Sequence, residues 1–133
     1  MNNQIKKVHE FHKKFNIEES ENPSLIDFDE YILRYDLMEE ENKEYKEACL
    51  NRDLVEVADA LGDQLYILCG TILKHGLQHK IEEVFNEIHS SNLSKLDKNG
   101  KPIYRNDGKV LKGENYFKPN LEPIVYGYLE DKK

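Results

Sequence analysis

Apolar residues recur at helical spacing along most of the chain, and breaks separate one run from the next. The spacing predicts helices over about residues 4–15, 27–50, 53–75 and 77–90. Asp27 followed by Glu30 resembles a capping box at the start of the second helix. Gly76 is suited to the left-handed turn that ends many helices, so it should end the third. The pattern therefore predicts a four-helix body.

The pattern changes after Ser91. Two turn signals follow, Asn99-Gly100 and Asp107-Gly108, and the second separates the short runs "PIYR" and "KVL". Such an arrangement predicts a small β-hairpin. We expect one domain over residues 1–133, all-α in class, with a helical body over about 4–90. A basic C-terminal extension over about 91–133 would carry the hairpin.

The third predicted helix is apolar almost all round, which normally means burial. Three acids nevertheless interrupt it, Glu56, Asp59 and Asp63. Successive helical residues are about 100° apart, so the three fall within a sector of about 60°. Each unpaired buried ion costs several kcal/mol. Raised pKa values, basic partners or metal ions must therefore compensate these carboxylates.

The second predicted helix carries acids of its own beside its apolar stripe. Glu41 borders that stripe, and Glu44 lies one turn further along. On antiparallel neighbouring helices, this pair and the pair Glu56 and Asp59 can converge. Such oxygen ligands suit Mg²⁺, whereas soft-metal sites use His or Cys. The alternative is a solvated acidic stripe balanced by lysines of the same helix.

Net charge is −7, which argues against a nucleic-acid-binding surface, because neutralising phosphates requires a basic patch. Acids dominate residues 27–63 and bases dominate 95–118, as expected for a metal site and a phosphorylated ligand or for two ordinary solvated faces. No signal-like or membrane-length apolar stretch is present. Cys49 and Cys69 read as free, buried, reduced thiols. We expect a soluble cytoplasmic protein without membrane contact.

The acids also form a family signature. "EENKE" at residues 40–44, followed by "EVAD" at 56–59, resembles the E-E-x-x-E … E-x-x-D pattern of the all-α nucleotide pyrophosphohydrolases. These include MazG-type enzymes, dimeric dUTPases and phosphoribosyl-ATP pyrophosphohydrolase. "SNLSK" and "DGKVLKG" are similar to elements of the MazG-like branch. The resemblance runs from about Val8 to Pro119 and implies a MazG-like helical bundle.

The resemblance implies that a nucleoside triphosphate is hydrolysed between its α and β phosphates, giving a monophosphate and pyrophosphate. Such an enzyme could clear unwanted nucleotides. The implied cofactor is Mg²⁺, with Mn²⁺ as a substitute. The implied ligands are Glu41, Glu44, Glu56 and Asp59. Asp63, which precedes a "QLY" run as the last signature acid does in several relatives, is a further ligand or a supporting acid. Glu40 would position or deprotonate the attacking water.

The basic extension would supply groups that bind the phosphates. The candidates are Asn92, Lys95, Lys109 and Lys112. The alternative is a helix-end turn for the first two and surface lysines for the others. His9, His12 and Phe15 could line a base pocket or belong to the core. Relatives form dimers or tetramers, and so few bulky apolar residues would hardly support a monomer, so a homodimer or homotetramer is expected.

Two other functions stay open at this point. One is phosphoribosyl-ATP pyrophosphohydrolase activity in histidine synthesis. The other is a non-catalytic helical protein that binds a nucleotide or a partner through the same acidic groove.

Overall fold

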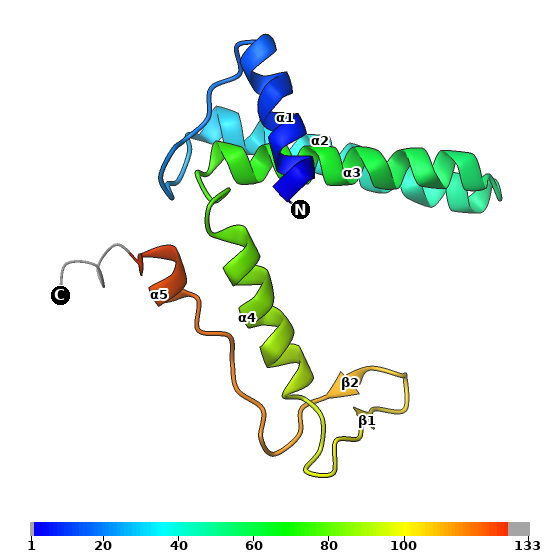
Figure 1. The fold of residues 1–133 in the computed structure, drawn as a ribbon. Helices are drawn as coiled ribbons and strands as arrows, with labels where there is room; N and C mark the ends of the chain where they lie inside the picture. The colour runs from blue at the N-terminus through cyan, green and yellow to red at the C-terminus, as the bar shows by residue number, and fades with distance from the viewer. Residues whose placement is uncertain (1, 128–133) are drawn as a thin grey trace. The chain divides into compact units, whose positions relative to one another are not determined.

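The computed structural model describes residues 2–127, so the end of the predicted extension, 128–133, lies outside it. It is mostly helical with one two-stranded antiparallel hairpin, which confirms the predicted class (Figure 1). The helices are α1 (Asn2–Lys14), α2 (Phe28–Leu50), α3 (Leu54–Lys74), α4 (Ile81–Leu93) and α5 (Glu122–Val125), and the strands are β1 (Ile103–Tyr104) and β2 (Val110–Leu111).

The chain divides into two compact units between His79 and Lys80. The division falls before α4, so this helix groups with the C-terminal segment. The sequence pattern predicts the boundary between the helical body and the basic extension near Ser91, towards the end of that helix. The description of the whole chain as one domain stays a prediction.

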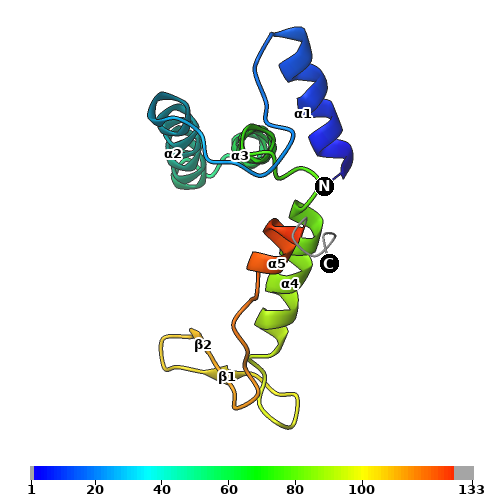
Figure 2. The same cartoon turned by 90° about the vertical axis from the view of Figure 1, so that its left-hand side faces the viewer.

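In the first unit, α2 and α3 form a long antiparallel pair, and α1 packs against α3 (Figure 2). The turn between α2 and α3 is tight, with Arg52 at φ 56°. Asp53 then caps α3, because its side chain accepts a hydrogen bond from the backbone N–H of Glu56. The turn and the cap together set the first residue of α3, and so the positions of its acids along the helix.

The core of this unit is small. Its buried apolar side chains are Ile5, Val8, Ala48, Ala60, Cys69, Ile72 and Leu73. The expectation that α3 is buried all round is wrong for a single chain, because Leu54 is 80% exposed and Val55 76%. Cys49 is exposed as well, contrary to the predicted burial of both thiols. Within the first unit, α1 packs against α3, and Leu54 and Val55 at the start of α3 stay exposed.

The predicted helix ends differ in outcome. Asp27 is the residue before α2, but its side chain makes no capping hydrogen bond, so that half of the predicted capping box is wrong. The carboxylate of Glu30 accepts from Lys74 Nζ at 2.9 Å, which is the main cause that lowers its pKa, and a hydrogen bond with the Asp27 backbone contributes as well. Gly76 ends α3 as predicted, at φ 68°, and a Cβ there would collide with the backbone oxygen of Asn22.

The second unit contains α4, the hairpin and α5. The strands pair Ile103 with Leu111 and Tyr104 with Val110, and Gly108 supplies the positive φ of 88° at the turn. The predicted hairpin is therefore confirmed. The segment after the hairpin contacts α4, because the Oγ–H of Ser91 donates to the Phe117 carbonyl at 2.8 Å. Within residues 2–127, no helix has the length and apolarity needed to cross a membrane.

Candidate metal centre

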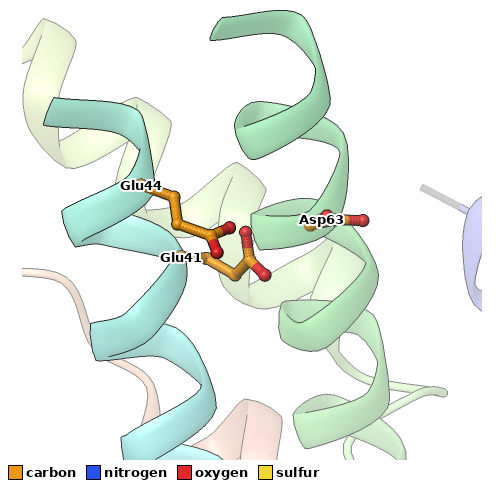
Figure 3. Close-up of side chains that lie close together, drawn as sticks. All are labelled: Glu41, Glu44 and Asp63. Atoms are coloured by element: carbon orange, nitrogen blue, oxygen red, sulfur yellow. The ribbon is translucent and has the colours of Figure 1, made fainter. Parts of the chain in front are cut away.

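Two helices bring three acids together. Glu41 and Glu44 project from neighbouring turns of α2, and Asp63 comes from α3 (Figure 3). One carboxylate oxygen from each lies within 4.8 Å of the other two. The antiparallel pairing of the helices makes this possible, since α2 approaches the turn where α3 leaves it. We call these three residues the acid cluster.

The acid cluster concentrates negative charge without compensation from the described part of the chain. No basic side chain among residues 2–127 forms an ion pair with Glu41, Glu44 or Asp63. Within the same range, the buried Oε2 of Glu41 has no hydrogen-bond partner. Buried polar atoms are nearly always satisfied, so this oxygen requires an explanation.

Burial and neighbouring carboxylates shift the protonation of the acid cluster. Burial raises the pKa of Glu41 most, and the neighbouring Glu44, then Asp63 and Glu40, raise it further, to about 7. Burial is also the main cause that raises the pKa of Asp63, followed by the charges of Asp59 and Glu44. A cation bound at such a cluster would relieve the repulsion between these carboxylates and favour their ionised form.

The other two predicted metal ligands lie beside the acid cluster. Glu56 and Asp59 are exposed, and both line a neighbouring hollow of about 260 Å³ that Glu44 also lines. The five predicted ligands therefore fall into two adjoining groups that share Glu44. Among them, Asp63 is the acid of α3 that comes together with Glu41 and Glu44.

Glu40 is exposed on α2, and its charge contributes to the raised pKa of Glu41. The four predicted phosphate-binding residues are all in the second unit. Asn92 is exposed near the end of α4, Lys95 follows that helix, Lys109 is in the hairpin turn, and the ammonium of Lys112 lies 4.8 Å from the ring centre of Tyr116. Their roles stay predictions.

The residues suggested for a base pocket lie in the first unit. The carboxylate of Glu19 bonds to Nδ1 of both His9 and His12, at 2.7 and 2.8 Å. His12 is 3% exposed and lines a hollow beside α3, whereas Phe15 is 64% exposed. Burial is the largest effect on the pKa of His12 and lowers it, although Glu19 opposes this.

Two buried cations, Arg34 and Lys74, were not among the residues singled out from the sequence. Arg34 of α2 is 9% exposed and lies between α2 and α3. It precedes Glu41 by seven residues, which places both on the same face of the helix. That spacing was available in the sequence, but an arginine within an apolar stripe usually reaches solvent with its charged end.

The acids and the helices that present them match a known family. A family model described as "Phosphoribosyl-ATP pyrophosphohydrolase" matches residues 8–92, a range that includes every predicted metal ligand. The chain belongs to the phosphoribosyl-ATP pyrophosphohydrolase family. As a member of this family, it is a pyrophosphohydrolase, and the resemblance to the MazG-like enzymes is confirmed.

A solved structure supports the fold of this pyrophosphohydrolase. The structure is of a protein from Exiguobacterium sp. 255-15 that is provisionally named an NTP pyrophosphohydrolase. It shares 24% sequence identity with this chain, covers 98% of both chains and has a TM-score of 0.54. No curated protein matches this chain.

Proposed function

We propose that this pyrophosphohydrolase cleaves a nucleoside triphosphate between the α and β phosphates, giving a nucleoside monophosphate and pyrophosphate. The observation that carries the proposal is the acid cluster of Glu41, Glu44 and Asp63, with the unpartnered Glu41 Oε2 at its centre. A role in clearing unwanted nucleotides is consistent with such an activity.

The acid cluster fits Mg²⁺, with Mn²⁺ as a substitute. Mg²⁺ prefers a few carboxylates, with waters and substrate phosphates completing its coordination. Glu41, Glu44 and Asp63 would hold the ion. Glu56 and Asp59, in the adjoining hollow, would hold a second ion or the waters around the first. When bound, the ion would neutralise negative charge on the triphosphate and lower the pKa of the attacking water.

The protein's own side chains would complete the reaction. Glu40 is exposed beside Glu41 and would accept a proton from the attacking water or orient it. Asn92, Lys95, Lys109 and Lys112 would donate hydrogen bonds to phosphate oxygens, where negative charge gathers during cleavage.

We also propose that the working form is a homodimer or a homotetramer. Beside the α2–α3 pair, a hollow of about 700 Å³ is lined by Tyr31, Tyr35, Met38 and Leu68, and both tyrosines and the leucine are exposed. Exposed apolar surface of this kind usually marks an interface. A second copy of the chain is the occupant we propose. Light scattering should give twice or four times the chain mass, and a monomer mass would contradict this proposal.

The activity can be tested with the purified full chain and a panel of ribo- and deoxynucleoside triphosphates. We expect pyrophosphate release with Mg²⁺, retained with Mn²⁺ and lost in a chelator. Glu41→Gln and Asp59→Asn should abolish it. Glu10→Gln, an exposed acid of α1 paired with Lys14, is the matched control and should stay active. Metal binding without turnover of any nucleotide would refute the proposal and favour a non-catalytic binding protein.

Phosphoribosyl-ATP is a second candidate substrate, because the matching family carries its name. It belongs in the same panel. A kcat/KM for phosphoribosyl-ATP far above that for every nucleoside triphosphate would decide for this alternative.

A further inference from the structure

Arg34 is a buried cation without a counter-ion. Its Nε–H donates to Thr71 Oγ1 and its Nη2–H to the Ile67 carbonyl, both at 3.1 Å. No acidic side chain among residues 2–127 forms an ion pair with it. The nearby Lys74 differs, because it is paired with Glu30.

The surroundings of Arg34 are shaped for its guanidinium. A Cβ at Gly70 would lie 2.7 Å from Arg34 Nη2, so the glycine lets the backbone of α3 approach the charged group. A guanidinium carries five N–H donors and no acceptor. Thr71 and Ile67 use two of them. The remaining donors form no hydrogen bond with residues 2–127, so they can donate to an acceptor that enters a hollow beside Arg34.

Arg34 lines the hollow of about 700 Å³ described above and a second one of about 360 Å³. The walls of the second hollow are mainly apolar, and His12 and the Lys74–Glu30 ion pair also line it. Phe11 of α1 and Tyr66 of α3 are on its wall, with ring centres 5.7 Å apart and planes nearly perpendicular. Leu33 and Leu37 of α2 also line it. Small-molecule pockets have this size and this combination of apolar walls with a few polar groups.

The hollow begins one helical turn from the acid cluster. Leu37 precedes Glu41 by four residues on α2, and Tyr66 follows Asp63 by three on α3. Arg34 is seven residues before Glu41, which is about 10 Å along the helix axis. A ribose and base that extend from a triphosphate at the acid cluster would cover this span.

We propose that this hollow receives the nucleobase of the substrate and that Arg34 selects bases with a keto oxygen over adenine. This inference rests on the proposed function. A guanidinium can only donate, and guanine offers the adjacent acceptors O6 and N7, while thymine and uracil offer O4. Adenine places an amino donor at the position of O6, where it would face the donors of Arg34.

The test compares GTP with 2-aminopurine riboside triphosphate, which lacks O6 and the N1–H that accompanies it but keeps N7 and the 2-amino group. With the wild-type chain and Mg²⁺, kcat/KM should be about tenfold or more higher for GTP, as for one lost charged hydrogen bond. ATP should be disfavoured similarly. Isothermal titration with the same nucleotides measures the selectivity in binding, independently of turnover.

Variants then assign the selectivity to Arg34. Arg34→Met should lower kcat/KM for GTP about tenfold or more and change that for 2-aminopurine riboside triphosphate by less than about threefold. Arg34→Lys, which keeps the charge and loses the planar fork, should retain part of the preference. Lys46→Met, which removes an exposed cation from the same helix, is the control and should keep the wild-type ratio.

The outcomes separate this inference from the proposed function. Turnover or binding that is equal for GTP and the analogue would overturn the inference while the proposed function stands. Preferential binding of GTP without any turnover would support the base pocket and refute the proposed function. If Arg34→Met does not fold, a partial loss of the GTP preference in Arg34→Lys supports the inference, and an unchanged ratio in that variant overturns it.

Discussion

Glu41→Gln should stabilise the metal-free protein and remove its stabilisation by Mg²⁺. The substitution keeps the size of the side chain and removes one of three negative charges whose oxygens lie within 4.8 Å of one another. A single pair of charges at that distance repels by about 1 kcal/mol in water and about 3 kcal/mol at an effective dielectric constant of 20. We expect the free energy of unfolding to rise by about 1 to 2 kcal/mol above neutral pH.

The effect should depend on pH with a definite sign. The pKa of Glu41 is about 7 in the fold against an ordinary 4.5, raised mainly by burial and then by Glu44. The folded state therefore holds this proton more tightly than the unfolded state. The corresponding stability is complete below about pH 4.5 and is lost as pH rises to about 7. Wild type and Glu41→Gln should differ little at pH 4.5 and most at pH 8.

The assay is urea unfolding followed by helical circular dichroism, in chelator and in Mg²⁺. An ion at one hundred times its Kd adds about 2.7 kcal/mol to wild type at pH 8, and Glu41→Gln should gain almost none of it. Glu10→Gln, which loses an exposed ion pair with Lys14, should change by less than about 1 kcal/mol and respond to Mg²⁺ as wild type does. A metal-free Glu41→Gln that is less stable than wild type at pH 8 would refute this reasoning.

Four further substitutions test other parts of the account. Gly76→Ala should lower the free energy of unfolding by more than about 2 kcal/mol, measured with urea, because it adds a collision to an unfavourable φ. Gly100→Ala, at φ 75° in open space, should cost only about 1 kcal/mol, and equal losses would contradict this. Gly70→Ala should displace the Arg34 guanidinium and reduce the kcat/KM preference for GTP over ATP, so an unchanged ratio would count against the base pocket. Lys95→Ala should raise KM for the triphosphate about tenfold, as for one lost charged hydrogen bond, and an unchanged KM would exclude that contact.

Local signals made the helices and the hairpin predictable. Apolar periodicity predicted the ends of α1 to α4 to within a few residues. Gly76 and Gly108 adopt the positive φ that their turn signals indicated. These features depend on neighbours along the chain. The main partner of Glu30 was not predictable in this way, because Lys74 is distant in sequence.

The site was predictable only in part. The spacing within α2 selected Glu41 and Glu44, but which acid of α3 meets them depends on how far one helix slides along the other. Periodicity within a single helix cannot fix that offset, and the structure brings Asp63 to the cluster while Glu56 and Asp59 line the adjoining hollow. Arg34 was missed because its burial depends on the close approach of Gly70 from another helix.

The central claim is metal-dependent cleavage between the α and β phosphates at the acid cluster. Phosphorus NMR of the products tests it most directly, with the full chain, the nucleoside triphosphate turned over fastest, and Mg²⁺. The account predicts nucleoside monophosphate and pyrophosphate in equal amounts, and neither product with Glu41→Gln or in chelator. Nucleoside diphosphate with inorganic phosphate, or undiminished products from Glu41→Gln, would contradict it.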